Sequence, residues 1–213
     1  MSAKQIQRLT GLSYKSALFL LHRVWFPMAD MQGVKLSGTV EADETYVGGK
    51  PRPGTGYHKR GRGTSKTPVF AMVERNGRVQ SRVVADVTAA TLKGAIREVV
   101  QAQSRLMTDE SQSYNGLATE FAGGHHTVCH SAGEYARGDV HSNTAETVFS
   151  LVKRGMYGVY HNVSKRHPHR YLAEFDFRWN HRQVEDGERT VAAIRGAEGK
   201  RLLYREPLAD AVA

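Results

Sequence analysis

The order of strand-like and helix-like patterns is the feature that most constrains the fold of this chain. Three strand-like runs come first, and the second and third flank Asn76-Gly77, a dipeptide typical of hairpin turns. A helical pattern follows, and strands and helices then alternate. In chain order, the patterns cover residues 38–47, 69–73, 79–87, 88–103, 105–108, 111–121, 126–130 and 143–157. This β-β-β-α-β-α-β-α order predicts an α/β fold with a ribonuclease H-like mixed sheet and flanking helices.

Two acidic residues stand at the ends of strands that this fold pairs. Asp43 belongs to the first strand and Asp109 closes the fourth, and central pairing of these strands would bring the two carboxylates side by side. Strand periodicity places Glu41 on the same side as Asp43. Because open α/β sheets build their sites at strand ends, this edge is the candidate site.

The first 30 residues predict a partial helix-turn-helix. Two short helical patterns flank a turn at 10–13, and Ser13 is a suitable N-cap for the second. In such a motif Tyr14 and Lys15, near the start of the second helix, lie in the major groove of DNA. An ordinary amphipathic helix pair explains the same pattern.

Residues 31–185 then form the predicted catalytic domain, with a further helical pattern at 165–181. Residues 186–213 are expected to be a looser C-terminal tail packed on or near the core. Its apolar contacts would come from Val191, Ile194, Leu202 and Leu203.

The charge of the chain indicates a polyanionic partner. Thirty Lys and Arg against 21 Asp and Glu give a formal net charge of +9, which favours nucleic acid. No apolar run approaches the roughly 18 residues of a membrane span, and the first residues lack the order of a signal peptide. We therefore expect a cytoplasmic, nucleoid-associated protein with no membrane partner. Its single cysteine, Cys129, excludes a disulfide framework within these residues.

Residues 50–68 combine glycine and proline with basic side chains. Contact with DNA phosphate is one interpretation, and a solvated basic loop is the other. The candidate DNA-binding residues here are Lys50, Lys59, Arg60 and Arg62.

The stretch 141–155 predicts an amphipathic helix whose exposed edge carries Glu146 and Lys153. Each acid has a structural explanation on its own: Asp43 as a strand end, Asp109 as a cap, and Glu146 in a capping box with Asn143. Taken together, the three acids stand on the two strands and the helix that this fold brings together. Clustered carboxylates repel unless a cation lies between them, so they predict a hard divalent ion. Two Mg²⁺ ions, or Mn²⁺, would suit displacement at phosphorus.

Three segments carry a resemblance to a known family. They are Glu41-Ala42-Asp43-Glu44-Thr45-Tyr46-Val47-Gly48-Gly49-Lys50, then Thr108-Asp109-Glu110-Ser111, and then His141-Ser142-Asn143-Thr144-Ala145-Glu146 with Leu151-Val152-Lys153-Arg154-Gly155. They resemble the DDE transposases of bacterial insertion sequences, in the fifteen-ninety-five group with its ISXO-two-like domain. The 36 residues between Asp109 and Glu146, and a lysine seven after Glu146, fit that family's spacing. Glu174 and Arg178 resemble its downstream acid and arginine.

The resemblance implies two-metal cleavage of a transposon end followed by strand transfer into target DNA. Asp43, Asp109 and Glu146 would be both the catalytic residues and the metal ligands, with Lys153 and Arg154 on DNA phosphate. Some members use asparagine as the third ligand, so Asn143 competes with Glu146. The implied partners are double-stranded transposon ends, target DNA, and further copies of the chain assembled on DNA.

Two other functions remain open at this point. A truncated, catalytically silent transposase would act only as a DNA-binding protein or repressor, and a nuclease or resolvase of the same fold would cut without joining. A zinc site is not expected within this chain, because its histidines and cysteine follow no trusted tetrahedral spacing. The residues concerned are His125, His126, Cys129, His130 and His141.

Overall fold

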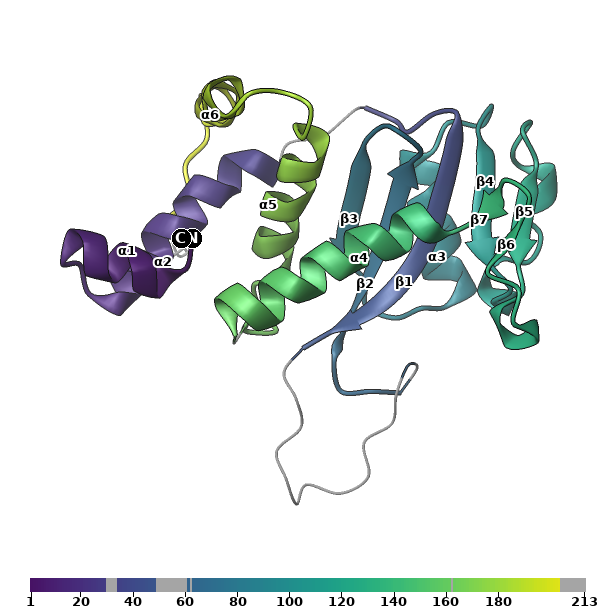
Figure 1. Ribbon diagram of the computed structural model, residues 1–213, viewed down its shortest axis with the longest axis horizontal. Coiled ribbons are helices and arrows are strands. Elements are labelled where there is room, and N and C mark those ends of the chain that lie inside the picture. Colours follow the sequence, from purple (N-terminus) through teal and green to yellow (C-terminus); the bar gives the residue numbers. More distant parts are fainter. Residues whose placement is uncertain (30–33, 49–60, 62, 162, 204–213) are drawn as a thin grey trace, which may run out of the picture.

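The computed structural model describes residues 1–29, 34–48, 61, 63–161 and 163–203 (Figure 1). The helices are α1 (Ala3–Thr10), α2 (Tyr14–Trp25), α3 (Ala89–Val99), α4 (Asn143–Gly155), α5 (Pro168–Asn180) and α6 (Asp186–Arg195). The strands are β1 (Thr39–Val47), β2 (Thr67–Glu74), β3 (Val79–Val83), β4 (Arg105–Asp109), β5 (His125–Val128), β6 (Ala136–Arg137) and β7 (Val140–His141). The short turns are η1 (Phe26–Ala29), η2 (Gln112–Tyr114), η3 (Leu117–Thr119), η4 (His130–Ala132) and the π-helical η5 (Met156–Tyr160).

The main sheet has five strands in the order β3-β2-β1-β4-β5. The first three strands pair antiparallel, whereas β4 runs parallel to both β1 and β5. The predicted central pairing of the first and fourth strands is therefore confirmed. The predicted hairpin is confirmed as well, and Asn76 adopts a positive φ of 59° at its turn, a conformation that asparagine tolerates better than most residues.

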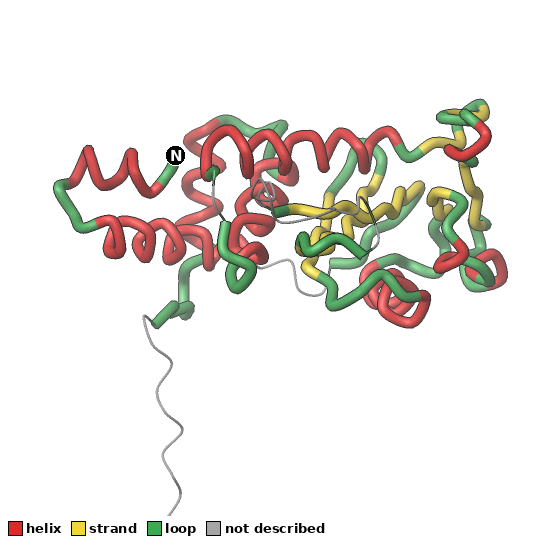
Figure 2. Tube along the Cα trace, turned by 90° about the horizontal axis from the view of Figure 1, so that it is seen from below, coloured by secondary structure: helices red, strands yellow, loops and turns green. Residues whose placement is uncertain are grey.

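Alternation along the strands divides the core between the two faces of the sheet. Val69, Ala71 and Val73 of β2 join one buried cluster with apolar residues of α4 and α5. Phe70 and Met72, on the opposite face, join the cluster that includes α3. Figures 1 and 2 show α4 lying across one face while α3 covers the other. Helices thus flank the sheet on both sides, and β1 runs through the middle of the molecule.

The two N-terminal helices form as predicted and lie beyond α5, away from the sheet (Figure 1). The Ser13 hydroxyl accepts a hydrogen bond from the Ser16 amide and caps α2. At the other end of α2, Trp25 is buried, and its ring contacts those of Tyr160 and Tyr171 at centroid distances of 5.4 and 4.8 Å. Aromatic packing therefore attaches this helix pair to η5 and α5.

The predicted helix over 111–121 is wrong. The structure has two short 3-10 turns there, η2 and η3, separated at Gly116, whose φ of 89° is incompatible with a continuing helix. Two other elements are shorter than predicted, since β3 ends at Val83 and α3 ends at Val99.

The tail also differs from its prediction. Residues 186–195 form the regular helix α6 instead of a loose segment. The side chains of Val191 and Ile194 are 45% and 67% exposed, so these two residues do not enter the core. None of the helices in the described part of the chain is both long and apolar enough to traverse a lipid bilayer.

Asp176 of α5 is a buried carboxylate that connects this helix to β3. Its Oδ2 accepts a hydrogen bond from the Ser81 amide at 2.6 Å, while Oδ1 is buried without a hydrogen-bond partner. Burial raises the pKa of Asp176 to about 7, against the lowering effect of its hydrogen bonds from Ser81. Deprotonation of this residue therefore costs the folded state stability.

The Asp176→Asn variant tests this pH dependence. Because the folded state binds the Asp176 proton more tightly than the unfolded state, this residue lowers the free energy of unfolding as pH rises from about 4 to 7, by at most about 1.4 kcal/mol per pH unit. Urea unfolding at pH 5 and pH 8 should show a smaller loss in the variant than in the wild type. Asp186→Asn, at an exposed side chain, is the control. An equal loss in Asp176→Asn and wild type would contradict the assignment.

Candidate active site

A cavity of about 860 Å³ lies between β1 and α4. It contains carboxylates and cations: Asp43 and Glu44 come from β1, and Glu146, Lys153 and Arg154 come from α4. Its remaining lining residues are Thr45, Phe149, Ser150, Tyr157 and Gly158. Two of the three predicted metal ligands and both predicted helix cations therefore share one cavity.

Asp43 is the most perturbed acid in this cavity. Burial, together with the smaller effect of the neighbouring carboxylates of Glu44, Asp109 and Glu146, raises the pKa of its carboxyl to about 8. A hydrogen bond from the Glu44 amide, at 2.7 Å from Asp43 Oδ1, acts in the opposite direction. The side chain is therefore held among like charges in a place where ionisation is costly.

Asp109 closes β4 beside β1. The parallel pairing ends at Glu41 and Met107, and Asp43 and Asp109 each lie two residues beyond it on these adjacent strands. One oxygen of Asp109 accepts a hydrogen bond from the Ser111 amide at 3.0 Å, but the predicted capping role is wrong, because the helix that it would cap does not form and Ser111 is the N-cap of η2. Asp109 does not line the 860 Å³ cavity, but its charge acts on Asp43.

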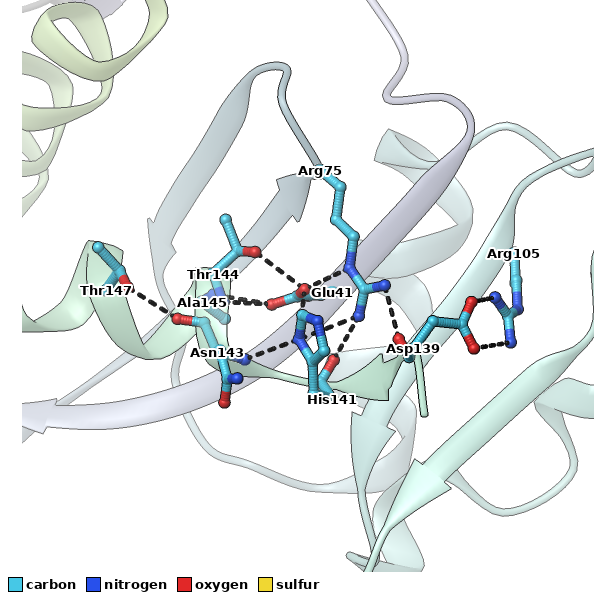
Figure 3. A network of polar contacts seen from close by, with 9 residues as sticks. All are labelled: Glu41, Arg75, Arg105, Asp139, His141, Asn143, Thr144, Ala145 and Thr147. Atoms are coloured by element: carbon cyan, nitrogen blue, oxygen red, sulfur yellow. Dashed lines mark hydrogen bonds and ion pairs between the residues drawn. The ribbon is translucent and has the colours of Figure 1, made fainter. Parts of the chain in front are cut away.

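Glu41 fixes the start of α4, a role that the sequence pattern did not reveal. Its carboxylate is fully buried, and Oε2 accepts hydrogen bonds from the amides of Thr144 and Ala145 at 2.7 and 3.0 Å (Figure 3). These are N-terminal amides of a helix, which have no partner within the helix itself. Ser142, the N-cap residue, makes no side-chain cap bond. Glu41 therefore caps α4, in place of the capping box predicted for Asn143 and Glu146.

Arg75 compensates the buried charge of Glu41. Its Nε donates to Glu41 Oε1 at 2.6 Å, and its other nitrogens donate to the carbonyl oxygens of Asp139 and His141 at 2.7 and 2.9 Å (Figure 3). Asp139 also pairs with Arg105 of β4. This network joins β1, β2, β4 and β7 to the start of α4, so the strands that carry Asp43 and Asp109 are tied to the helix that carries Glu146.

The two cations of α4 lie in its last turn. Positive side chains are favoured there because helix carbonyls accumulate negative partial charge at the C-terminus. The following Gly155 packs directly against α5, where a Cβ atom would approach the Phe175 ring to 2.1 Å. This close contact fixes where the segment carrying Lys153 and Arg154 meets α5.

The structure separates the other predicted DNA-binding residues. Lys50, Lys59, Arg60 and Arg62 lie outside the described residues. Tyr14 and Lys15 are both exposed but line different cavities, Tyr14 facing the η5 segment and Lys15 facing Arg23 on α2. Their side chains therefore do not form one common surface that could enter the major groove of DNA.

The downstream acid and arginine form an ion pair on α5, with Arg178 Nε at 2.8 Å from Glu174 Oε1. Neither lines the cavity that holds Asp43. The Tyr160 hydroxyl lies 3.5 Å from Glu174 Oε2, so the pair supports η5, the continuation of α4. Its position indicates a structural contribution.

The donor chemistry of the acidic group suits a hard divalent cation, because carboxylate oxygens are the ligands that such ions prefer. The raised pKa of Asp43 is what a carboxylate cluster shows before a cation compensates it. Among the described residues, no three His, Cys, Asp or Glu side chains are grouped closely enough to hold an ion as they stand. A bound ion would therefore have to draw the carboxylates closer together.

The sequence of this chain is similar to that of known proteins of transposable elements. Residues 35–180 match the ISXO2-like transposase domain family. A Halobacterium salinarum protein, described as an uncharacterized protein in transposable element ISH50, is 31% identical over 191 residues, which cover 83% of this chain and 64% of the relative. The chain thus spans just under two thirds of that relative's length.

Two solved structures are similar at low identity. A chain of the simian T-cell lymphotropic virus intasome in complex with PP2A regulatory subunit B56 gamma has a TM-score of 0.45 and 16% identity, covering 94% of this chain and 73% of that one. The Mos1 transposase paired-end complex with left transposon end has a TM-score of 0.34 and 11% identity, covering 93% and 75%. The family match spans β1, β4 and α4, the elements that carry the acids, and the chain belongs to the ISXO2-like transposase domain family.

Proposed function

We propose that this chain catalyses metal-dependent cleavage of transposon ends and their transfer into target DNA, on a ribonuclease H-like fold. The observation that carries the proposal is the shared cavity of Asp43 and Glu146 with Lys153 and Arg154, in a transposase-family domain. Asp109 completes the acidic group from the adjacent strand. Glu146 is favoured over Asn143 as the third ligand because Glu146 lines this cavity and Asn143 does not.

The side chains at this site have two roles: the basic ones bind DNA phosphate and the acidic ones bind the metal. Lys153 and Arg154 bind the phosphates beside the cut, which counters the repulsion that DNA would meet from the acids. Asp43, Asp109 and Glu146 hold the divalent ions. When bound, two such ions activate the attacking oxygen and stabilise the leaving oxygen in displacement at phosphorus. Asp43 is half-buried in the wall of this cavity.

Incubation of the purified chain with the labelled DNA ends of its own element tests the proposal. Mg²⁺ or Mn²⁺ should support cleavage, and a precut end with a free 3′-OH should join to supercoiled plasmid. Glu146→Gln is expected to lower the cleavage rate by at least about a thousandfold, or about 4 kcal/mol of barrier. The matched change Glu98→Gln, at an exposed glutamate paired with Arg82, should leave it unchanged.

The products distinguish the alternatives. Cleavage without joining would make the protein a nuclease or resolvase. If the protein binds DNA but does not cleave it with Mg²⁺ or Mn²⁺, it is a catalytically silent DNA-binding protein. The reason would then be that, among the described residues, the acids lie too far apart to hold a metal ion. Loss of activity in Asn143→Ala but not in Glu146→Gln would reassign the third ligand.

A further inference from the structure

A second cavity, of about 430 Å³, adjoins the acidic one. Gly158 of η5 lines both cavities. The second cavity lies between α1, the start of α2 and the end of η5. Its lining residues include Lys4, Arg8, Tyr14, Gly158 and His161. We call it the basic cavity.

The charge of the basic cavity is one-sided. Lys4 and Arg8 contribute cations, and no aspartate or glutamate occurs among its lining residues in the described part of the chain. The Lys4 ammonium lies 5.0 Å from the centroid of the Tyr14 ring and donates to Gln7, so its position is fixed by two contacts. Arg8 is exposed, one turn further along α1. An anion entering this cavity would meet two cations.

The backbone between the two cavities is unusual. α4 continues into a π-helical turn, Met156–Tyr160, and the next residue, His161, has a positive φ of 55° with a ψ of −45°. Both π-helical turns and strained non-glycine residues concentrate at functional sites. Here they turn the chain so that Tyr157 stays on the acidic cavity while His161 lines the basic one.

We propose that the basic cavity holds the phosphodiester backbone of the DNA strand whose scissile phosphate occupies the acidic cavity. The strand would pass from Lys153 and Arg154, across Gly158, to Lys4 and Arg8. Tyr157 stands beside this path with 41% of its surface exposed, where a base can stack on it. This inference rests on the proposed function and adds to it a path for the DNA and a contact made by α1.

Continuity and charge together favour a nucleic-acid strand over a small anion. Lys153 and Arg154 line one cavity, Lys4 and Arg8 line the other, and Gly158 lines both, so cations lie on both sides of this glycine, as a repeating phosphate backbone requires. The glycine at the junction leaves room for close approach, because a Cβ atom there would meet nothing within 4 Å. A compact anion would need only one of the two cavities.

Arg8→Glu tests the inference, with Arg195→Glu as its matched control. Arg195 is an exposed arginine in the last turn of α6 and lines neither cavity. Fluorescence anisotropy with a labelled duplex, in EDTA and over a range of salt, measures binding without cleavage. Arg8→Glu should weaken binding at least about tenfold and flatten the slope of log K against log salt by about 0.9 per lost phosphate contact. Arg195→Glu should change affinity less than about twofold, as expected for a charge that contacts no phosphate.

The cleavage reaction separates this inference from the proposed function. In single-turnover cleavage, Arg8→Glu should raise the protein concentration needed for half-saturation and keep the rate constant at saturation. Lys4→Gln is a second variant, which should also flatten the salt slope. Affinity and slope equal to wild type in both variants would overturn the basic cavity as a DNA site, even if the wild type cleaves. Weaker binding by Arg8→Glu in a chain that never cleaves would support the cavity and overturn the proposed function.

Discussion

Replacing Asp43 by asparagine is expected to lower DNA cleavage by at least about a thousandfold, or about 4 kcal/mol of barrier, and at the same time to stabilise the metal-free fold. Activity falls because the variant removes one of the three proposed metal ligands, the other two being Asp109 and Glu146. Stability rises because burial and three neighbouring carboxylates disfavour ionised Asp43, whose pKa is raised to about 8. An amide at this position carries no charge to desolvate.

Thermal unfolding in EDTA at pH 9 measures the second effect. At this pH wild-type Asp43 is mostly ionised, so the midpoint of Asp43→Asn should exceed that of the wild type by about 2–4 °C for each kcal/mol gained. The gain should shrink as pH falls toward 6, because wild-type Asp43 then takes up its proton. A variant that loses activity and is less stable at every pH would instead indicate a structural role.

Replacing Glu41 by alanine is expected to have the largest effect on the fold, with a loss of about 3–5 kcal/mol in the free energy of unfolding. The change leaves the Arg75 guanidinium without its buried partner and removes the acceptor for the Thr144 and Ala145 amides. Urea unfolding measures the loss. Cleavage by the residual folded protein should fall too, because Glu41 positions the helix that carries Glu146.

Glu98→Ala is the matched control for Glu41→Ala. Glu98 also pairs with an arginine, at 2.7 Å from Arg82, but its side chain is 68% exposed. Exposed pairs contribute about 0–1 kcal/mol, so this variant should unfold close to the wild type. Glu41→Gln retains an acceptor oxygen and should fall between Glu41→Ala and the wild type. Equal losses in the Glu41 and Glu98 alanine variants would contradict the positioning role.

Much of the fold was predictable because strands and helices have different periods. The alternation in β2 sends Val69 and Ala71 to one face and Phe70 to the other, and the Asn76-Gly77 turn sets the hairpin. The central β1–β4 pair followed from the order of elements. The failures were local: Gly116 breaks a segment whose apolar spacing suited a helix.

The sequence indicated the three acids of the candidate site but not the residues that support them. Asp109 closes β4 and Glu146 is exposed on α4, as predicted, whereas Asp43 lies in the middle of β1 and not at the strand end predicted for it. Glu41 was passed over, although a glutamate inside an apolar strand signals a buried, paired charge. Its partner Arg75 lies in the hairpin turn, and its α4 amides come from a segment more than 100 residues further along the chain. A one-dimensional pattern contains no signal for such a long-range contact.

The central claim is that Asp43, Asp109 and Glu146 share divalent metal. Anomalous diffraction from a crystal of the chain soaked in Mn²⁺ measures this directly, because the anomalous signal locates each ion. The account predicts Mn²⁺ bound by oxygens of all three carboxylates, between β1, the end of β4 and the exposed edge of α4. Mn²⁺ bound only elsewhere on the protein, with this carboxylate group free of metal at saturating concentration, would contradict it.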